Sequence, residues 1–307
     1  MIHLIPAYFD FLLRSTNQHG VHSPFVYSLV TKCFYDKKKY PSYSILKQYR
    51  QSLLQDKRKI KLKDFGAGSR VFTSDEREVS KMVKNAGISP KRARLLNRLV
   101  RYLEVDHALE LGTHLGLGTA AMAAGNEVKI TTIEGCPETA AIAGEKFNDF
   151  RINNIQLIVG RFEDVLENRE NSKFQIPNPN SSPTANRSSF PQPFKDSQPI
   201  TDNSQLTTDN LQLKTPNSQL PTPNYDLVYI DGNHQKEATL SYFEKLLPTI
   251  HNDSVIIFDD IHWSKGMEEA WEEIKAHPKV RVSIDTFHWG LVFFRREQEK
   301  EHFVIRV

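Results

Sequence analysis

Cysteine and long apolar runs are scarce in this sequence of 307 residues. The two cysteines, Cys33 and Cys136, lie far apart with no CxxC spacing, so neither a disulfide framework nor a cysteine metal site is indicated. No apolar run approaches the length of a membrane-spanning helix. The opening residues MIHLIPAYFDFLLRS have no basic leading region and no small-residue cleavage site, so we expect no signal peptide. These absences predict a cytoplasmic protein without a membrane partner.

Positive charge is concentrated in the first third of the chain. The net charge is only +3, but residues 1–101 hold 21 Lys and Arg against 7 Asp and Glu. This excess indicates an anion-binding surface or a basic segment that docks on the acidic remainder of the chain. In PKRARLLNRLVRYL, leucines recur at helical spacing and leave arginines on the other face. We therefore predict a mainly helical basic cap over residues 1–87, docked on the rest.

Short β-rich runs alternate with helical stretches from residue 107 onward. This alternation predicts right-handed crossovers and a doubly wound α/β domain with a mostly parallel, Rossmann-like sheet. Two final runs predict a closing antiparallel hairpin. The domain is expected over residues 88–170 and 225–307. The expected strands lie in HALELGT, KITTIEG, IQLIVG, YDLVYID and SVIIFDD, and the hairpin in RVSIDTF and GLVFFRR.

Residues 171–224 differ in composition from the rest of this domain and interrupt it. Asn, Pro, Ser, Thr and Gln dominate there, and few residues could form a core, so a disordered low-complexity insert is predicted. The insert follows a helix and precedes a strand. Such a loop lies at the sheet edge opposite the ligand-binding edge, and deletion of residues 175–220 should leave the fold and ligand affinity intact.

A glycine-rich loop connects the first strand of the domain to the helix that follows it. Glycines allow a tight turn and a close backbone approach to a ligand. A dinucleotide loop is one interpretation, because Gly116, Gly118 and Ala121 satisfy GxGxxA. The full pattern is ExGxxxGxG, however, and its leading acid suits a cationic ammonium and would oppose a pyrophosphate. The candidate binding residues in LELGTHLGLGT are Glu110, Gly112, Thr113, Gly116 and Gly118.

The ExGxxxGxG pattern resembles the first motif of the class I S-adenosylmethionine-dependent methyltransferases. The stretch ISPKRARLLNRLVRYLEVDHALELGTHLGLGT is similar to the O-methyltransferase branch that includes catechol, caffeoyl-coenzyme A and related sugar enzymes. The resemblance covers residues 88–296 apart from the insert. It implies S-adenosylmethionine as cofactor, with Glu134 at the ribose and Arg161, Phe162 or Glu163 at the adenine.

The stretch YIDGNHQKE places Asp231 and His234 directly behind the fourth strand, and Asp259 and Asp260 end the fifth. Neighbouring parallel strands would bring these acids together at the edge of the glycine loop. Three oxygen-bearing side chains suit Mg²⁺ or another divalent cation, and the resemblance implies such a metal as well as a cofactor contact from Asp231. His234 could take a proton from the acceptor. Alternatively, Asp231 is a turn residue and Asp260 caps the next helix.

These features predict an S-adenosylmethionine-dependent methyltransferase that modifies a small-molecule hydroxyl, with assistance from a divalent metal left open. Three alternatives remain at this stage. The acceptor could be RNA or another polyanion held by the basic segment. The chain could be a nucleoside-binding module without turnover, or a nicotinamide oxidoreductase. A homodimer is also compatible with the sequence.

Overall fold

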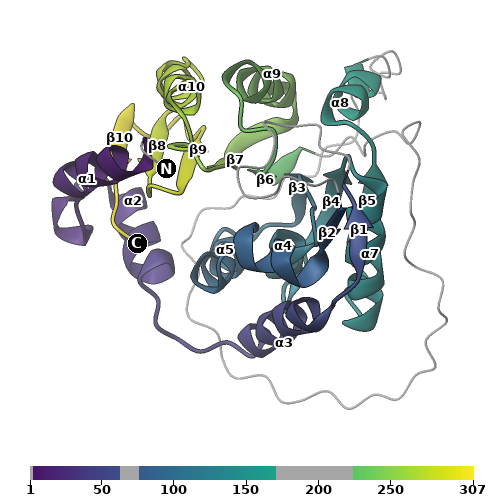
Figure 1. The fold of residues 1–307 in the computed structure, drawn as a ribbon. Helices are drawn as coiled ribbons and strands as arrows, with labels where there is room; N and C mark the ends of the chain where they lie inside the picture. Colours follow the sequence, from purple (N-terminus) through teal and green to yellow (C-terminus); the bar gives the residue numbers. More distant parts are fainter. Residues whose placement is uncertain (1–2, 63–75, 171–223) are drawn as a thin grey trace, which may run out of the picture.

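The computed structural model describes residues 3–62, 76–170 and 224–307 (Figure 1). The predicted insert at 171–224 therefore lies outside the described residues except for its last position. Within the described ranges, no helix is both long and apolar enough to cross a membrane.

The core of the fold is an eight-stranded sheet with the strand order β10-β8-β9-β7-β6-β3-β4-β5. All neighbouring pairs from β7 to β5 are parallel, and β9 runs antiparallel to both β7 and β8. The predicted doubly wound sheet with its closing hairpin is thus confirmed, and β10 adds an edge strand parallel to β8. The strands are β3 (His107–Leu111), β4 (Lys129–Glu134), β5 (Ile155–Val159), β6 (Tyr225–Ile230), β7 (Ile250–Asp259), β8 (Val282–Asp285), β9 (Trp289–Phe293) and β10 (Glu301–Val304).

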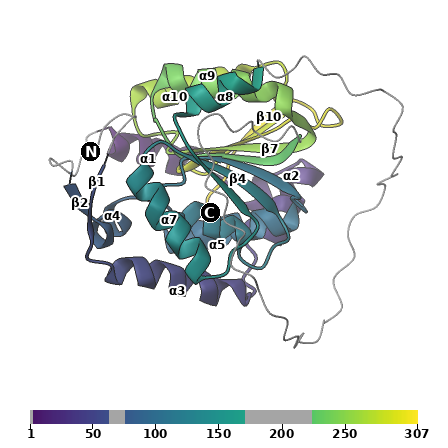
Figure 2. The ribbon, with the colours of Figure 1, turned by 90° about the vertical axis from the view of Figure 1, so that its right-hand side faces the viewer.

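Helices cover both faces of this sheet, as Figure 2 shows. Along β6, Leu227 and Tyr229 belong to one apolar core while Val228 and Ile230 belong to the other. A strand buried on both faces reads as a nearly continuous apolar run. One layer consists of α8 (Phe162–Glu170), α9 (Lys236–Leu246) and α10 (Lys265–Ala276), and the other contains α5 (Pro90–Tyr102), α6 (Leu117–Ala123) and α7 (Pro137–Asp149).

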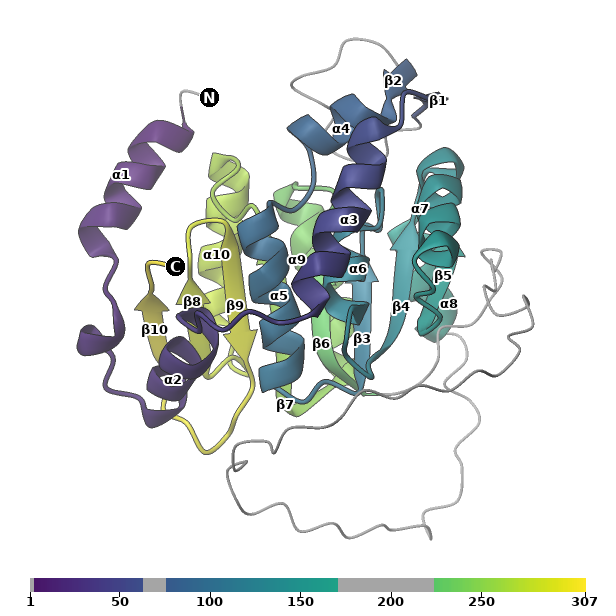
Figure 3. The same cartoon turned by 90° about the horizontal axis from the view of Figure 1, so that it is seen from below.

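The N-terminal residues pack against the second layer and the β10 edge (Figures 1 and 3). Leu29, Leu53 and Val83 are fully or almost fully buried in the same core as the sheet, and Thr16 pairs with Ile305 beside β10. Residues 3–62 and 76–87 therefore share a core with the domain instead of forming one of their own. Their elements are α1 (Leu4–Arg14), α2 (Pro24–Leu29), a π-helix (Val30–Phe34), α3 (Ser42–Gln55), β1 (Lys59–Lys61), β2 (Glu76–Glu78) and α4 (Val79–Asn85).

Several arginines of the basic region make internal contacts. Arg98 donates to the backbone carbonyl of Cys33 at 2.8 Å, and Arg50 donates to that of Val83 at 3.0 Å. Arg58 pairs with Glu145 of α7 at 2.8 Å. A guanidinium that satisfies buried carbonyls is fixed in place and is less available to an external polyanion. These contacts favour the docking interpretation of the basic segment.

Candidate active site

The strand register brings the predicted site residues to one edge of the sheet. Leu111 of β3 is paired with Ile133 of β4 and with Ile230 of β6, and Ile230 is paired with Phe258 of β7. The residues that follow these positions therefore emerge side by side at the carboxyl ends of the strands. In open α/β sheets, this is the edge at which ligands bind.

The backbone conformation of the glycine loop requires glycine at two positions. Gly112 has φ +107°, and a Cβ there would collide with the carbonyl oxygen of Asp231. Gly116 has φ +75° and precedes α6, and a Cβ there would collide with Tyr49 and Phe147. L-residues rarely adopt such φ values, so glycine is required at both positions. The loop after β3 can thereby lie directly against the end of β6.

Glu110 lies beneath this loop. Its side chain is 1% exposed, and its Oε2 accepts hydrogen bonds from the hydroxyls of Thr119 and Thr132. Burial raises the pKa of Glu110 to about 8, so the group is largely protonated at neutral pH. This placement differs from the expectation that Glu110 faces a cationic ammonium. Thr113 is buried as well, with its Oγ1 at 2.6 Å from that of Thr132.

Glu134, at the end of β4, stays partly exposed beside the loop. Its Oε2 accepts the backbone N–H of His114 at 2.6 Å, and its Oε1 accepts that of Cys136 at 2.8 Å. Each carboxylate oxygen has further acceptor capacity. The side chain is therefore held rigidly while it can still accept hydrogen bonds from a ligand's hydroxyl groups.

Phe162 and Glu163 open α8, next to the end of β6. The Phe162 ring lies against the backbone of Gly232, since a Cβ at that glycine would be 2.8 Å from the ring. Glu163 accepts a hydrogen bond from the Tyr242 hydroxyl, which in turn accepts one from Asn233 at 3.0 Å. The start of α8 is thus tied to the segment that carries Asp231 and His234.

Asp231 and His234 lie together beside a cavity. His234 Nε2 is 3.9 Å from Asp231 Oδ1, and the His234 ring centroid is 6.2 Å from that of Trp263. Burial and the nearby Asp260 charge raise the pKa of Asp231 to about 6. The cavity measures about 440 Å³, and its lining consists of His234, Gln235, Lys236, Glu237, Trp263, Ser264, Gly266 and Glu269.

Two of the three predicted metal ligands, Asp259 and Asp260, face basic side chains in this structure. Asp259 is only 5% exposed, and its Oδ1 is 2.7 Å from Nη1 of Arg92. Asp260 has φ +52° and lies 3.9 Å from Nδ1 of His288. Among the residues that the structure describes, no group of three or more His, Cys, Asp or Glu could hold a metal ion. Because a guanidinium already sits on the most buried acid, this donor set does not fit a divalent cation.

Two details of this edge were not anticipated from the sequence. Ser264, and not Asp260, caps α10, with its Oγ accepting the backbone N–H of Met267 at 3.2 Å. From the sequence pattern, Arg92 is expected with the other arginines on the exposed face of the helix, although it precedes Leu95 and Leu96 by three and four residues. That spacing puts Arg92 on the buried face of α5, so its burial could have been predicted from the sequence.

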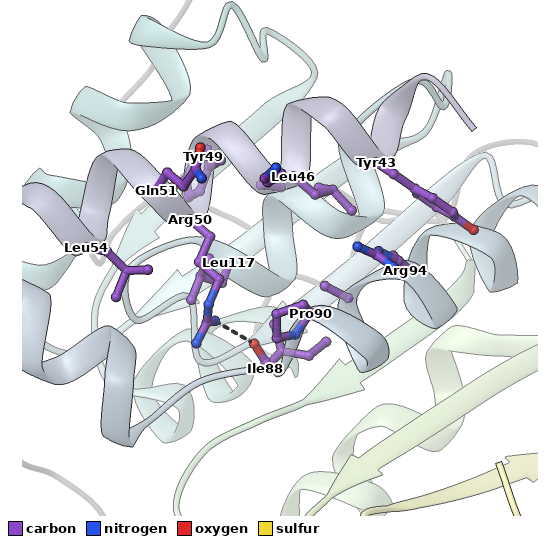
Figure 4. Close-up of a pocket in the computed structure, with 13 residues that line it drawn as sticks. Tyr43, Leu46, Tyr49, Arg50, Gln51, Leu54, Ile88, Pro90, Arg94 and Leu117 are labelled. Carbon is purple, nitrogen blue, oxygen red and sulfur yellow. Dashed lines mark hydrogen bonds between the residues drawn. The ribbon is translucent and has the colours of Figure 1, made fainter. Parts of the chain in front are cut away.

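A second cavity lies among α3, α5 and α6 (Figure 4), and no strand-end acid lines it. It measures about 110 Å³, well below the ~300–1,000 Å³ of typical ligand pockets. Arg50 closes one side by donating to the Ile88 carbonyl at 3.1 Å. We regard it as a packing gap between the N-terminal helices and the domain.

Comparisons with known proteins agree with this architecture. Residues 109–261 match a family model described as a methyltransferase domain. No curated protein matches the chain significantly. Among solved structures, the SAH-bound methyltransferase PaMTH1 of Podospora anserina is 11% identical, with a TM-score of 0.51 and coverage of 90% of this chain and 97% of that one. An O-methyltransferase from Bacillus cereus in complex with SAH is 17% identical, with a TM-score of 0.47 and coverage of 86% and 95%. The O-methyltransferase TomG from Streptomyces achromogenes, in complex with SAM, is 14% identical, with a TM-score of 0.49 and coverage of 87% and 95%.

The matched residues run from β3 through the glycine loop and the β6 edge to the residues just after β7. They include every strand end at which the site residues lie. At 11% identity, the likeness to PaMTH1 shows the fold alone, and the family model shows the domain type. Residues 109–261 therefore match a methyltransferase domain, and the sheet to which they contribute β3 to β7 has a methyltransferase fold.

Proposed function

We propose that this protein is an S-adenosylmethionine-dependent O-methyltransferase that acts on a small-molecule hydroxyl. One observation carries the proposal. The glycine loop, the Glu134 carboxylate and the Asp231–His234 pair meet at a single edge of the sheet, and His234 also lines a cavity of about 440 Å³. The fold shared with PaMTH1, whose structure holds SAH, supports the same cofactor here.

The cofactor would be held by the loop and the strand ends. Glu134 fits the ribose, because both of its oxygens are fixed by backbone donors and retain acceptor capacity. Phe162 offers an aromatic ring for the adenine, and Glu163 a carboxylate beside it. We assign the remaining contacts to the backbone of Gly112, Gly116 and Gly118 and to Asp231. Glu110 and Thr113 would support the loop from below, since both are buried.

When bound, S-adenosylmethionine supplies an electrophilic methyl group on a sulfonium. The chain then has to orient an acceptor hydroxyl and remove its proton as the oxygen–methyl bond forms and the sulfur–methyl bond breaks. His234 Nε2 would receive that proton, and the nearby Asp231 carboxylate would stabilise the imidazolium. Most of the rate enhancement would come from holding the two reactants together, because methyl transfer needs little other assistance.

The cavity beside His234 supports a polar small molecule as the acceptor. Its volume is in the range of small-ligand pockets, and its lining combines polar side chains with the partly exposed Trp263. A polar small molecule with several hydroxyl groups suits such a lining better than an apolar one. The internal contacts of Arg50, Arg58 and Arg98 disfavour RNA as the acceptor. We assign catalysis to a domain of residues 88–170 and 225–307, and a supporting role to residues 1–87.

Calorimetric titration with S-adenosylmethionine and SAH tests the cofactor, and transfer of a labelled methyl group to a panel of phenols, catechols and sugars tests the reaction. We expect both ligands to bind and at least one acceptor to be methylated. Binding without transfer to any acceptor would favour the non-catalytic module. Absence of binding of either ligand would refute the proposal.

A further inference from the structure

Arg92 reaches the acid cluster because of its place on α5. The buried positions of this helix include Leu95, Leu96 and Leu99, and side chains three and four residues apart share one face. The Ser89 hydroxyl accepts the backbone N–H of Arg92 at 3.3 Å and caps the helix there. Arg92 consequently points toward the sheet from the first turn, and its side chain is only 20% exposed.

The guanidinium then meets the ends of two neighbouring strands. Its Nη1 is 2.7 Å from Oδ1 of Asp259, the last residue of β7. It also interacts electrostatically with Asp231, which follows β6, and with Asp260. A guanidinium keeps its charge under all ordinary conditions. Arg92 is therefore a permanent positive charge among three acids that are otherwise close enough to repel one another.

A divalent cation would have to compete with this guanidinium for Asp259. Mg²⁺ binds carboxylate oxygens at ~2.0–2.1 Å with strict octahedral geometry. A nitrogen at 2.7 Å from Oδ1 already occupies the space in front of that oxygen. Both species are cations, so the presence of one raises the cost of binding the other.

We propose that Arg92 takes the place of a divalent metal ion in the cluster of Asp231, Asp259 and Asp260. Its guanidinium neutralises Asp259 and steadies the acids beside His234. The mechanistic meaning rests on the proposed function: the acceptor proton would leave to His234 without help from a metal. The replacement of a metal ion by the guanidinium does not itself depend on the proposed function. Arg92 is accordingly a positioning residue.

Metal binding by the full-length protein tests this directly. Mn²⁺ is titrated into wild type, R92K, R92Q and the double variant R92Q/D259N, and free Mn²⁺ is followed by its electron paramagnetic resonance signal. Wild type and R92K should leave the signal unchanged, because both keep a cation at the cluster. R92Q should gain a single site with about tenfold or greater affinity over wild type, and the double variant should lose it.

Two results would overturn the inference. One is stoichiometric Mn²⁺ binding by wild type that is abolished in a D259N variant titrated in the same way. The other is a folded R92Q protein that binds Mn²⁺ no better than wild type. Circular dichroism establishes folding, and if R92Q does not fold, the wild-type titration decides alone. SAH titration of the same samples reports on the proposed function separately, since loss of SAH binding would leave the Mn²⁺ result standing.

Discussion

Replacement of Glu110 by Gln should stabilise the protein, and the gain should grow with pH. The carboxyl is 1% exposed, and its Oε1 has no hydrogen-bond partner among the described residues. Burial raises its pKa from 4.5 to about 8. Between these values the unfolded chain ionises Glu110 while the folded chain keeps it protonated. The wild type therefore loses stability as pH rises.

The size of this stability change follows from the shift in the pKa of Glu110. Each pKa unit corresponds to ~1.4 kcal/mol, so the free energy of unfolding of wild type should fall by about 2–3 kcal/mol between pH 5 and 7 on account of Glu110 alone. In E110Q this contribution disappears, because the amide does not ionise. Its carbonyl oxygen can still accept from Thr119 and Thr132. The amide N–H groups take the position of Oε1, which has no partner in the part of the chain that the structure describes, and the resulting cost does not vary with pH.

The assay is urea unfolding at pH 5, 6, 7 and 8 on wild type, E110Q and E127Q, in which an exposed carboxylate is changed in the same way. The stability difference between E110Q and wild type should widen with pH, and that for E127Q should stay constant. SAH affinity should be the same in E110Q as in wild type. A constant difference for E110Q, together with weaker SAH binding, would refute the reasoning and restore Glu110 as a charged contact of the cofactor.

Three further predictions address the site and its loop. H234Q should lower kcat by roughly 10²–10⁴-fold in the methyl-transfer assay while SAH binds normally. The control is H251Q, which breaks a His–Asp pair at the other end of β7 and should leave kcat unchanged. E134Q should weaken SAH binding in calorimetry by roughly ten- to a hundredfold, because it removes a charged acceptor; undiminished affinity would exclude Glu134 as the ribose contact. G116A should lower the midpoint of thermal unfolding markedly, since a Cβ meets Tyr49 and Phe147 at a positive φ, and an unchanged midpoint would contradict the loop geometry.

Much of the fold could be predicted because its signals are local. Apolar runs such as YDLVYI and SVIIF are too continuous for a half-exposed strand and indicate a sheet covered on both faces. Gly112 stands where β3 ends, so the loop was recognisable from residue spacing alone. The convergence of Asp231 and Asp259 also followed, because adjacent parallel strands end at one edge. The extra edge strand β10 was not predicted, because its residues EHFV lack the apolar–polar alternation that VSID of β8 has.

The sequence by itself determined the order of the elements, the glycine loop and the line of acids at the strand ends, because each depends on residues within one strand or one turn. The tertiary structure decided what those acids do. It buried Glu110 under the loop and turned Arg92 onto Asp259, a partner 167 positions along the chain. Whether an acid binds a ligand, a metal or an arginine depends on which helix faces it and on how much water remains, and both are set only when distant segments pack together.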